Sequence, residues 1–179
     1  MAIAMPVVER HPNREAFRGV LTLVDVASDR APAGARGHRV VLTRRAAEEA
    51  LPSLLGMGLD YSPSFDRHDV RRKVGVITRA EIVGRAVELG GYLFAKDFPE
   101  IVQEIGRGGS LAGAGEGGRV ARPHTGHSRT RLGMSYEIAE ARVADVRTKI
   151  WTLTHVMFTG AAILRRENAA YQETWIELE

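Results

Sequence analysis

The chain has 179 residues, of which 44% are hydrophobic and 26% charged, and its formal net charge is +3. This composition predicts one globular domain rather than a disordered or membrane protein. The small charge excess, spread over scattered arginines, does not indicate a nucleic-acid-binding protein. The complete lack of cysteine excludes disulfides, thiolate metal sites and a cysteine nucleophile.

The sequence contains no candidate membrane span or signal peptide. No apolar run reaches the roughly 18 residues that a membrane-spanning helix needs, and the first residues lack a basic segment followed by an apolar one. We therefore expect the protein to act in the compartment where it is made.

The first part of the chain predicts two strands followed by a helix. Residues 1–16 are a polar, extended lead-in, residues 17–26 are rich in β-branched and aliphatic side chains, and residues 39–42 form a second short strand. Thr43 offers an N-cap hydroxyl to alanines and leucines that recur at helical spacing as far as residue 55.

The middle of the chain predicts a loop, a hairpin and a short helix. Residues 60–69 are loop-like and deliver His68 directly in front of a strand at 73–82. A second strand at 85–95 follows after a glycine, so the pair predicts a hairpin. A capping-box-like start predicts a helix over 97–105.

The last part of the chain begins with a long segment rich in glycine and arginine, residues 106–131, which we expect to be one mobile functional loop. Two strands at 132–143 and 149–159 follow. An alanine-rich segment at 161–171 predicts a helix, and residues 172–179 read as a polar tail.

These elements predict a mostly β fold with peripheral helices, of the α+β class. Six strands with two or three inserted helices and no β-α-β alternation favour an antiparallel sheet or small barrel. We expect a single domain over residues 17–171 that contains the loop 106–131, flanked by the lead-in 1–16 and the tail 172–179.

His68 is the first candidate for chemistry. Asp66 and Asp69 flank it at the end of a loop that feeds a strand, and nearby carboxylates suit an imidazole to general-base work. The alternative, from the residues alone, is a hydrogen-bonded loop histidine.

His155 is the second candidate, because strand alternation places it on an apolar face with Trp151 and Leu153. The alternative is a core histidine whose ring nitrogens are satisfied. If the strands 132–143 and 149–159 are joined by a turn around residue 146, Ser135 lies opposite or diagonal to His155, with side chains about 5 Å apart.

The remaining histidines indicate no metal site. His11 and His38 are expected at the surface, and His124 and His127 lie in the glycine-rich loop without a further ligand nearby. Because cysteine is absent, Ser135 is the natural nucleophile for acyl transfer, provided that a base and an orienting partner lie within reach.

Three motifs in this order resemble a known family. They are His68 in a loop before a hairpin, the segment 133–138 (GMSYEI) with Ser135, and the segment 153–160 (LTHVMFTG) with His155. Together they resemble the caudoviral prohead (capsid maturation) serine proteases and, more distantly, the herpesvirus assemblins, over roughly residues 17–170. The resemblance implies a compact antiparallel β-barrel of about six or seven strands edged by helices.

The resemblance also implies a role for each motif residue. Ser135 matches the nucleophile, His68 the general base, and His155 the third member of the triad, which is a histidine in assemblins and an acidic residue in many phage relatives. Gly160, Ala161 and Ala162, before the predicted last helix, are the region where backbone N–H groups would form an oxyanion hole. The Tyr-Glu pair after Ser135 and the histidine at the third position depart from the commoner phage pattern.

The implied function is a serine endopeptidase with a Ser-His-His triad that processes scaffold protein and major capsid protein during maturation of a bacteriophage or prophage capsid. We expect it also to cleave itself and to act inside the assembling procapsid in the cytoplasm of a bacterial host. No cofactor, metal, specific nucleic acid or membrane is expected as a partner, and a homo-oligomer stays open. The alternatives are a catalytically silent relative that serves as a capsid-assembly or scaffolding module and, less favoured, a basic nucleic-acid-binding barrel.

Overall fold

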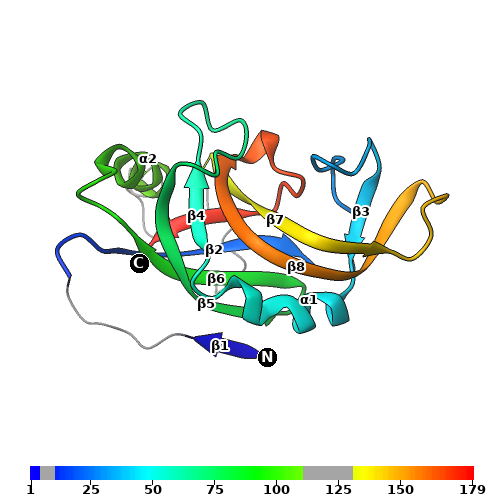
Figure 1. Cartoon of the computed structure of the whole chain (residues 1–179). Coiled ribbons are helices and arrows are strands. Elements are labelled where there is room, and N and C mark those ends of the chain that lie inside the picture. Colours follow the sequence, from blue (N-terminus) through cyan, green and yellow to red (C-terminus); the bar gives the residue numbers. More distant parts are fainter. Residues whose placement is uncertain (5–10, 111–130) are drawn as a thin grey trace, which may run out of the picture.

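A computed structural model describes residues 1–4, 11–110 and 131–179 of the chain. The described part is mostly β, with two α-helices, and its strands form one curled sheet of mixed strand directions (Figure 1). The sheet closes only halfway around its core, so it is a half-barrel. The prediction of a mostly β fold with peripheral helices is therefore confirmed.

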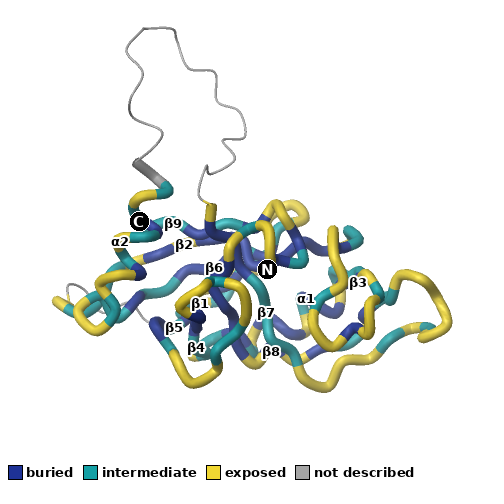
Figure 2. Tube along the Cα trace, turned by 90° about the horizontal axis from the view of Figure 1, so that it is seen from above, coloured by how far each residue is buried: buried dark blue, intermediate teal, exposed yellow. Residues whose placement is uncertain are grey.

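The strands lie in the order β3, β8, β4, β5, β6, β2, β9, with β1 added to β5 and β7 paired to β8. Figure 2 shows that buried residues follow the inner strands, whereas the connection between β7 and β8 is exposed. The bounds are β1 Ala2–Ala4, β2 Glu15–Leu23, β3 Arg39–Leu42, β4 Gly58–Tyr61, β5 Lys73–Val83, β6 Ala86–Leu93, β7 Leu132–Val143, β8 Ile150–Arg165 and β9 Trp175–Leu178.

The expected closed antiparallel barrel is wrong in two respects. First, β8 is 16 residues long and runs parallel to β3 along its first part and to β4 along its last part. Second, β7, which pairs only with β8 among the described residues, and β9, at one end of the sheet, share no backbone ladder. The N–H of Met134 on β7 instead donates a hydrogen bond to Oγ1 of Thr174, just before β9 (3.1 Å). The sheet is therefore mixed and open.

The two helices lie outside the sheet. Helix α1 (Arg44–Ala50) begins as predicted, since Oγ1 of Thr43 accepts a hydrogen bond from the N–H of Ala46 (3.2 Å), and a 3₁₀ turn continues it over Leu51–Leu54. Helix α2 (Pro99–Ser110) runs five residues further than expected. No helix among the described residues has the length and apolar character needed to cross a membrane.

The first residues of the predicted loop 106–131, residues 106–110, belong to α2 instead. Residues 111–130 of this predicted loop, with His124 and His127, lie outside the described residues.

The predicted helix over 161–171 is wrong. Residues 161–165 continue β8, and a short 3₁₀ turn follows at 166–168. Residues 161–164 are all buried, so both faces of β8 are covered here, and a strand covered on both faces has a continuous apolar run without alternation. At its edges this part of β8 pairs with β4 and β7. The predicted polar tail contains β9, whose Ile176 is fully buried beside β2.

Candidate functional site

The loop between β4 and β5, residues 62–72, carries His68 and is held by its own side chains. The hydroxyls of Ser62 and Ser64 both donate hydrogen bonds to Oδ1 of Asp66, at 2.9 and 2.5 Å. These bonds, that of Ser64 first, hold the pKa of the Asp66 carboxyl below its usual value, so this carboxylate stays charged and keeps the loop together.

Phe65 fixes the same loop to the end of β8. Its φ is +53°, a conformation that a bulky residue rarely adopts. Its carbonyl oxygen accepts hydrogen bonds from the N–H of Arg165 (2.8 Å) and from Nδ2 of Asn168 (3.3 Å). The strained backbone is thus held from outside the loop, which places His68 beside β7 and β8.

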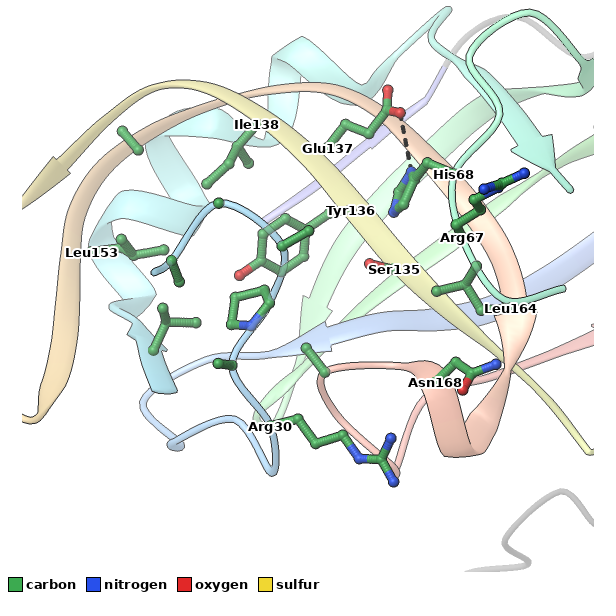
Figure 3. Close-up of a pocket in the computed structure, with 18 of the residues that line it drawn as sticks. Arg30, Arg67, His68, Ser135, Tyr136, Glu137, Ile138, Leu153, Leu164 and Asn168 are labelled. Carbon is green, nitrogen blue, oxygen red and sulfur yellow. Dashed lines mark ion pairs between the residues drawn. The ribbon is translucent and has the colours of Figure 1, made fainter. Parts of the chain in front are cut away.

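His68 faces two carboxylates. Its Nδ1 lies 3.1 Å from Oε1 of Glu137 and 3.9 Å from Oδ1 of Asp60, as Figure 3 shows for the Glu137 pair. The Nδ1 atom is buried and has no aligned hydrogen-bond partner among the described residues, so the contact with Glu137 is an ion pair whenever the imidazole is protonated. A carboxylate in this position stabilises an imidazolium.

Asp60 and Lys73 complete the cluster behind His68. The Asp60 side chain is fully buried, and it accepts hydrogen bonds from the N–H of Asp69 (3.0 Å) and from Nζ of Lys73 (3.1 Å). Lys73 Nζ also lies 4.0 Å from Oε2 of Glu137. A buried carboxylate needs such a partner, and the lysine supplies a positive charge beside both acidic side chains.

Gly160 makes room for Glu137. It pairs with Glu137 in the ladder between β7 and β8, and a Cβ atom at Gly160 would lie 2.8 Å from Oε2 of Glu137. Any side chain at this position would push the carboxylate away from its present place. Because Gly160 has no side chain, the carboxylate of Glu137 can occupy its place beside His68.

Ser135 shares a cavity with His68. Two residues apart on β7, Ser135 and Glu137 project from the same face of the strand. Together with His68 they line a cavity of about 900 Å³, in which the second ring nitrogen of His68 is turned toward the side where Ser135 lies (Figure 3). The described residues contain no hydrogen bond between Ser135 and His68.

His155 lies elsewhere. Ser135 pairs with Ala162, whereas His155 pairs with Arg142, which is about 20 Å of strand away from Ser135. The prediction that Ser135 and His155 are neighbours across the hairpin is therefore wrong, and His155 does not line the cavity. The role given to His155 stays a prediction with no contact to support it.

The reason for this error is the position of the turn. The N–H of Ala144 bonds to the carbonyl oxygen of Thr152 (2.9 Å), which centres the turn on residue 148. From this turn the ladder between β7 and β8, with its irregularities, pairs Val143 with Leu153 and Ser135 with Ala162.

Ala161 and Ala162 lie in the middle of the sheet. Ala161 pairs with Tyr136 on one side and Leu59 on the other, and Ala162 pairs with Ser135 and Asp60. A strand with neighbours on both sides directs its N–H groups into the two ladders. The oxyanion role of residues 160–162 stays a prediction. Because Ala161 and Ala162 pair with strands on both sides, their backbone N–H groups are directed into the ladders.

Three side chains of this cluster could also hold a metal ion. Ligand atoms of Asp60, His68 and Glu137 all lie within 4.8 Å of one another. Lys73 Nζ already contacts both carboxylates, so a cationic group of the chain itself occupies part of this space. We therefore interpret the cluster as a network of charged side chains around His68 rather than as a metal site.

The sequence pattern does not reveal Asp60, Lys73 and Glu137 as site residues. It predicts a loop at Asp60, whereas in the structure β4 carries Asp60 into the core. Glu137 had an available signal, since a residue two positions after a candidate nucleophile shares its strand face.

Comparison with known proteins adds no family to this geometry. No family model matches the chain, and no curated protein matches it with significant similarity.

Proposed function

We propose that this protein is a serine endopeptidase in which Ser135 is the nucleophile, His68 the general base and Glu137 the third member of the triad. The observation that carries the proposal is the placement of Ser135 and His68 on one cavity, with a carboxylate oxygen 3.1 Å from Nδ1 of His68. That contact leaves Nε2 of His68 available for the serine hydroxyl. Glu137 takes the role that the sequence analysis gave to His155.

The proposed reaction has two halves. His68 Nε2 accepts the proton of Ser135 Oγ as the oxygen attacks the peptide carbonyl, and it then gives this proton to the leaving amine. Water hydrolyses the resulting ester with His68 again as the base. Glu137 stabilises the imidazolium that forms in each half, and Nζ of Lys73 lies 4.0 Å from Oε2 of Glu137.

The biological setting of the proposal comes from the resemblance of the three motifs. The half-barrel would be an open variant of the prohead protease and assemblin barrel, with scaffold protein and major capsid protein as substrates. It would act inside an assembling procapsid in a bacterial cytoplasm and would also cleave itself.

The test compares cleavage by the wild-type protein and by Ser135→Ala. Each is incubated with a peptide mixture prepared from a bacterial proteome, and new N-termini are identified by mass spectrometry. We expect new termini with the wild type and with Thr154→Ala, an exposed residue of β8 outside the cavity, and none with Ser135→Ala. Equal cleavage by wild type and Ser135→Ala would overturn the proposal.

A catalytically silent scaffolding module is the second candidate. It is favoured by one observation, the lack of a hydrogen bond between Ser135 and His68 in the described residues. Catalytic hydrogen bonds are often long before substrate binds, so this observation weighs less than the shared cavity. The same experiment separates the two functions, because a silent module produces no new termini with any variant.

A further inference from the structure

We propose that the apolar half of the cavity is the specificity pocket of the enzyme. In this assignment it takes the substrate side chain next to the scissile carbonyl, one that is uncharged and carries a hydrogen-bonding group at its tip, as glutamine does. The hydroxyl of Tyr136 makes the hydrogen bond that selects this side chain. The inference rests on the proposed function and names its substrate class.

The cavity extends around β7 from the nucleophile to an apolar side. Ser135 and Glu137 project from one face of the strand, and Tyr136 and Ile138 from the other, yet all four line the same cavity. The apolar half is completed mainly by Pro32, Val40, Val143, Trp151 and Leu153.

A substrate side chain in the apolar half would therefore lie beside Tyr136, which directly follows Ser135 on β7. The lining favours a side chain with an apolar stem.

Tyr136 brings one polar atom into this apolar half. Its ring packs edge-on against Phe158, with 5.8 Å between the ring centroids, and Figure 3 shows its hydroxyl directed toward the side where Leu153 lies. The hydroxyl is shielded from solvent and has no hydrogen-bond partner among the described residues. A buried hydroxyl without a partner is costly, and a ligand that supplies one gains that interaction.

No neighbouring group within residues 1–4, 11–110 and 131–179 satisfies the Tyr136 hydroxyl. The hydroxyl of Tyr171 is the other buried phenol nearby, and it already bonds to the carbonyl oxygens of Val26 (3.1 Å) and Val40 (3.2 Å).

The pocket selects against charge. Arg30 and Arg67 line the cavity but are directed away from Tyr136 in Figure 3, and the acidic Glu137 lies on the face of Ser135. A carboxylate or ammonium in the apolar half would therefore be buried without an opposite charge, which is expensive. An uncharged side chain with a hydrogen-bonding tip therefore fits the apolar wall and the hydroxyl of Tyr136 better than a charged one.

The test measures cleavage of a peptide library that differs only at the residue contributing the scissile carbonyl. We expect the wild type to cleave after glutamine about tenfold faster than after leucine or glutamate, since one hydrogen bond to a buried hydroxyl is worth about one power of ten. Tyr136→Phe keeps the ring and removes the hydroxyl, and we expect its glutamine-to-leucine ratio to fall to about one. Tyr92→Phe, on β6 and outside the cavity, is the matched control and keeps the wild-type ratio.

The outcomes separate the two proposals. Cleavage without a glutamine preference, or a preference that survives in Tyr136→Phe, overturns the specificity assignment and leaves the endopeptidase standing. No cleavage of any peptide by the wild type overturns the endopeptidase and the pocket with it.

Discussion

Glu137 Oε1 lies 3.1 Å from Nδ1 of His68, and this carboxylate, rather than the imidazole of His155, is the group that the fold places against the proposed base. The two residues come from different parts of the sheet, His68 from the loop after β4 and Glu137 from β7. Both residues line the cavity together with Ser135.

Glu137→Gln should reduce kcat/KM at least about 100-fold, because a neutral amide cannot stabilise the imidazolium of His68. Glu140→Gln is the matched control, since Glu140 is an exposed residue on the same strand and outside the cavity. Its rate should equal that of the wild type. His155→Ala separates the two candidates for the third position: we expect it to keep wild-type kcat/KM, and a loss in His155→Ala with none in Glu137→Gln would return the role to His155.

Gly160→Ala should lower activity while the fold is retained. The added methyl group would meet Oε2 of Glu137 at 2.8 Å, and the flexible carboxylate rather than the backbone will give way. We expect a loss of turnover with a thermal midpoint close to that of the wild type. Gly106→Ala is the control, because the nearest atom of the described structure to its Cβ would be a carbon of Leu178 at 3.8 Å. Full activity of Gly160→Ala would show that the position of Glu137 does not matter.

Tyr136→Phe should stabilise the protein by about 1 kcal/mol, because it removes a buried hydroxyl that has no partner among the described residues. Tyr171→Phe offers the opposite case. Burial raises the pKa of Tyr171 to about 12, and its hydroxyl makes two hydrogen bonds, so this variant should lose about 1 to 3 kcal/mol. Urea unfolding of both variants tests the pair, and a destabilised Tyr136→Phe would mean that its hydroxyl is satisfied in the free protein.

Local sequence patterns were sufficient for the elements that depend on local chemistry. The strands 39–42 and 132–143 have the bounds that β-branched and apolar runs indicated, and Thr43 caps its helix as its hydroxyl predicted. The alanine-rich segment after residue 160 has good helix propensity, yet it is a strand because β4 and β7 pair with its two edges. Propensity could not reveal those neighbours.

Only those site residues that residue type and position along the chain indicate can be predicted from the sequence. His68 and Ser135 are of this kind, and both line the cavity. The third partner depended on the register of one hairpin, and a turn centred about two residues later moved His155 away from Ser135. The buried position of Asp60 could not be predicted, because a strand of only four residues has too short a pattern to be recognised in the sequence.

The most direct test of the account is the reaction of Ser135 with a fluorophosphonate, which modifies activated serine hydroxyls. The wild-type protein and His68→Ala are treated with the reagent, digested and mapped by mass spectrometry. We expect one adduct, on Ser135, in the wild type and a strongly reduced amount in His68→Ala. An unmodified Ser135, or equal modification with and without His68, would contradict it.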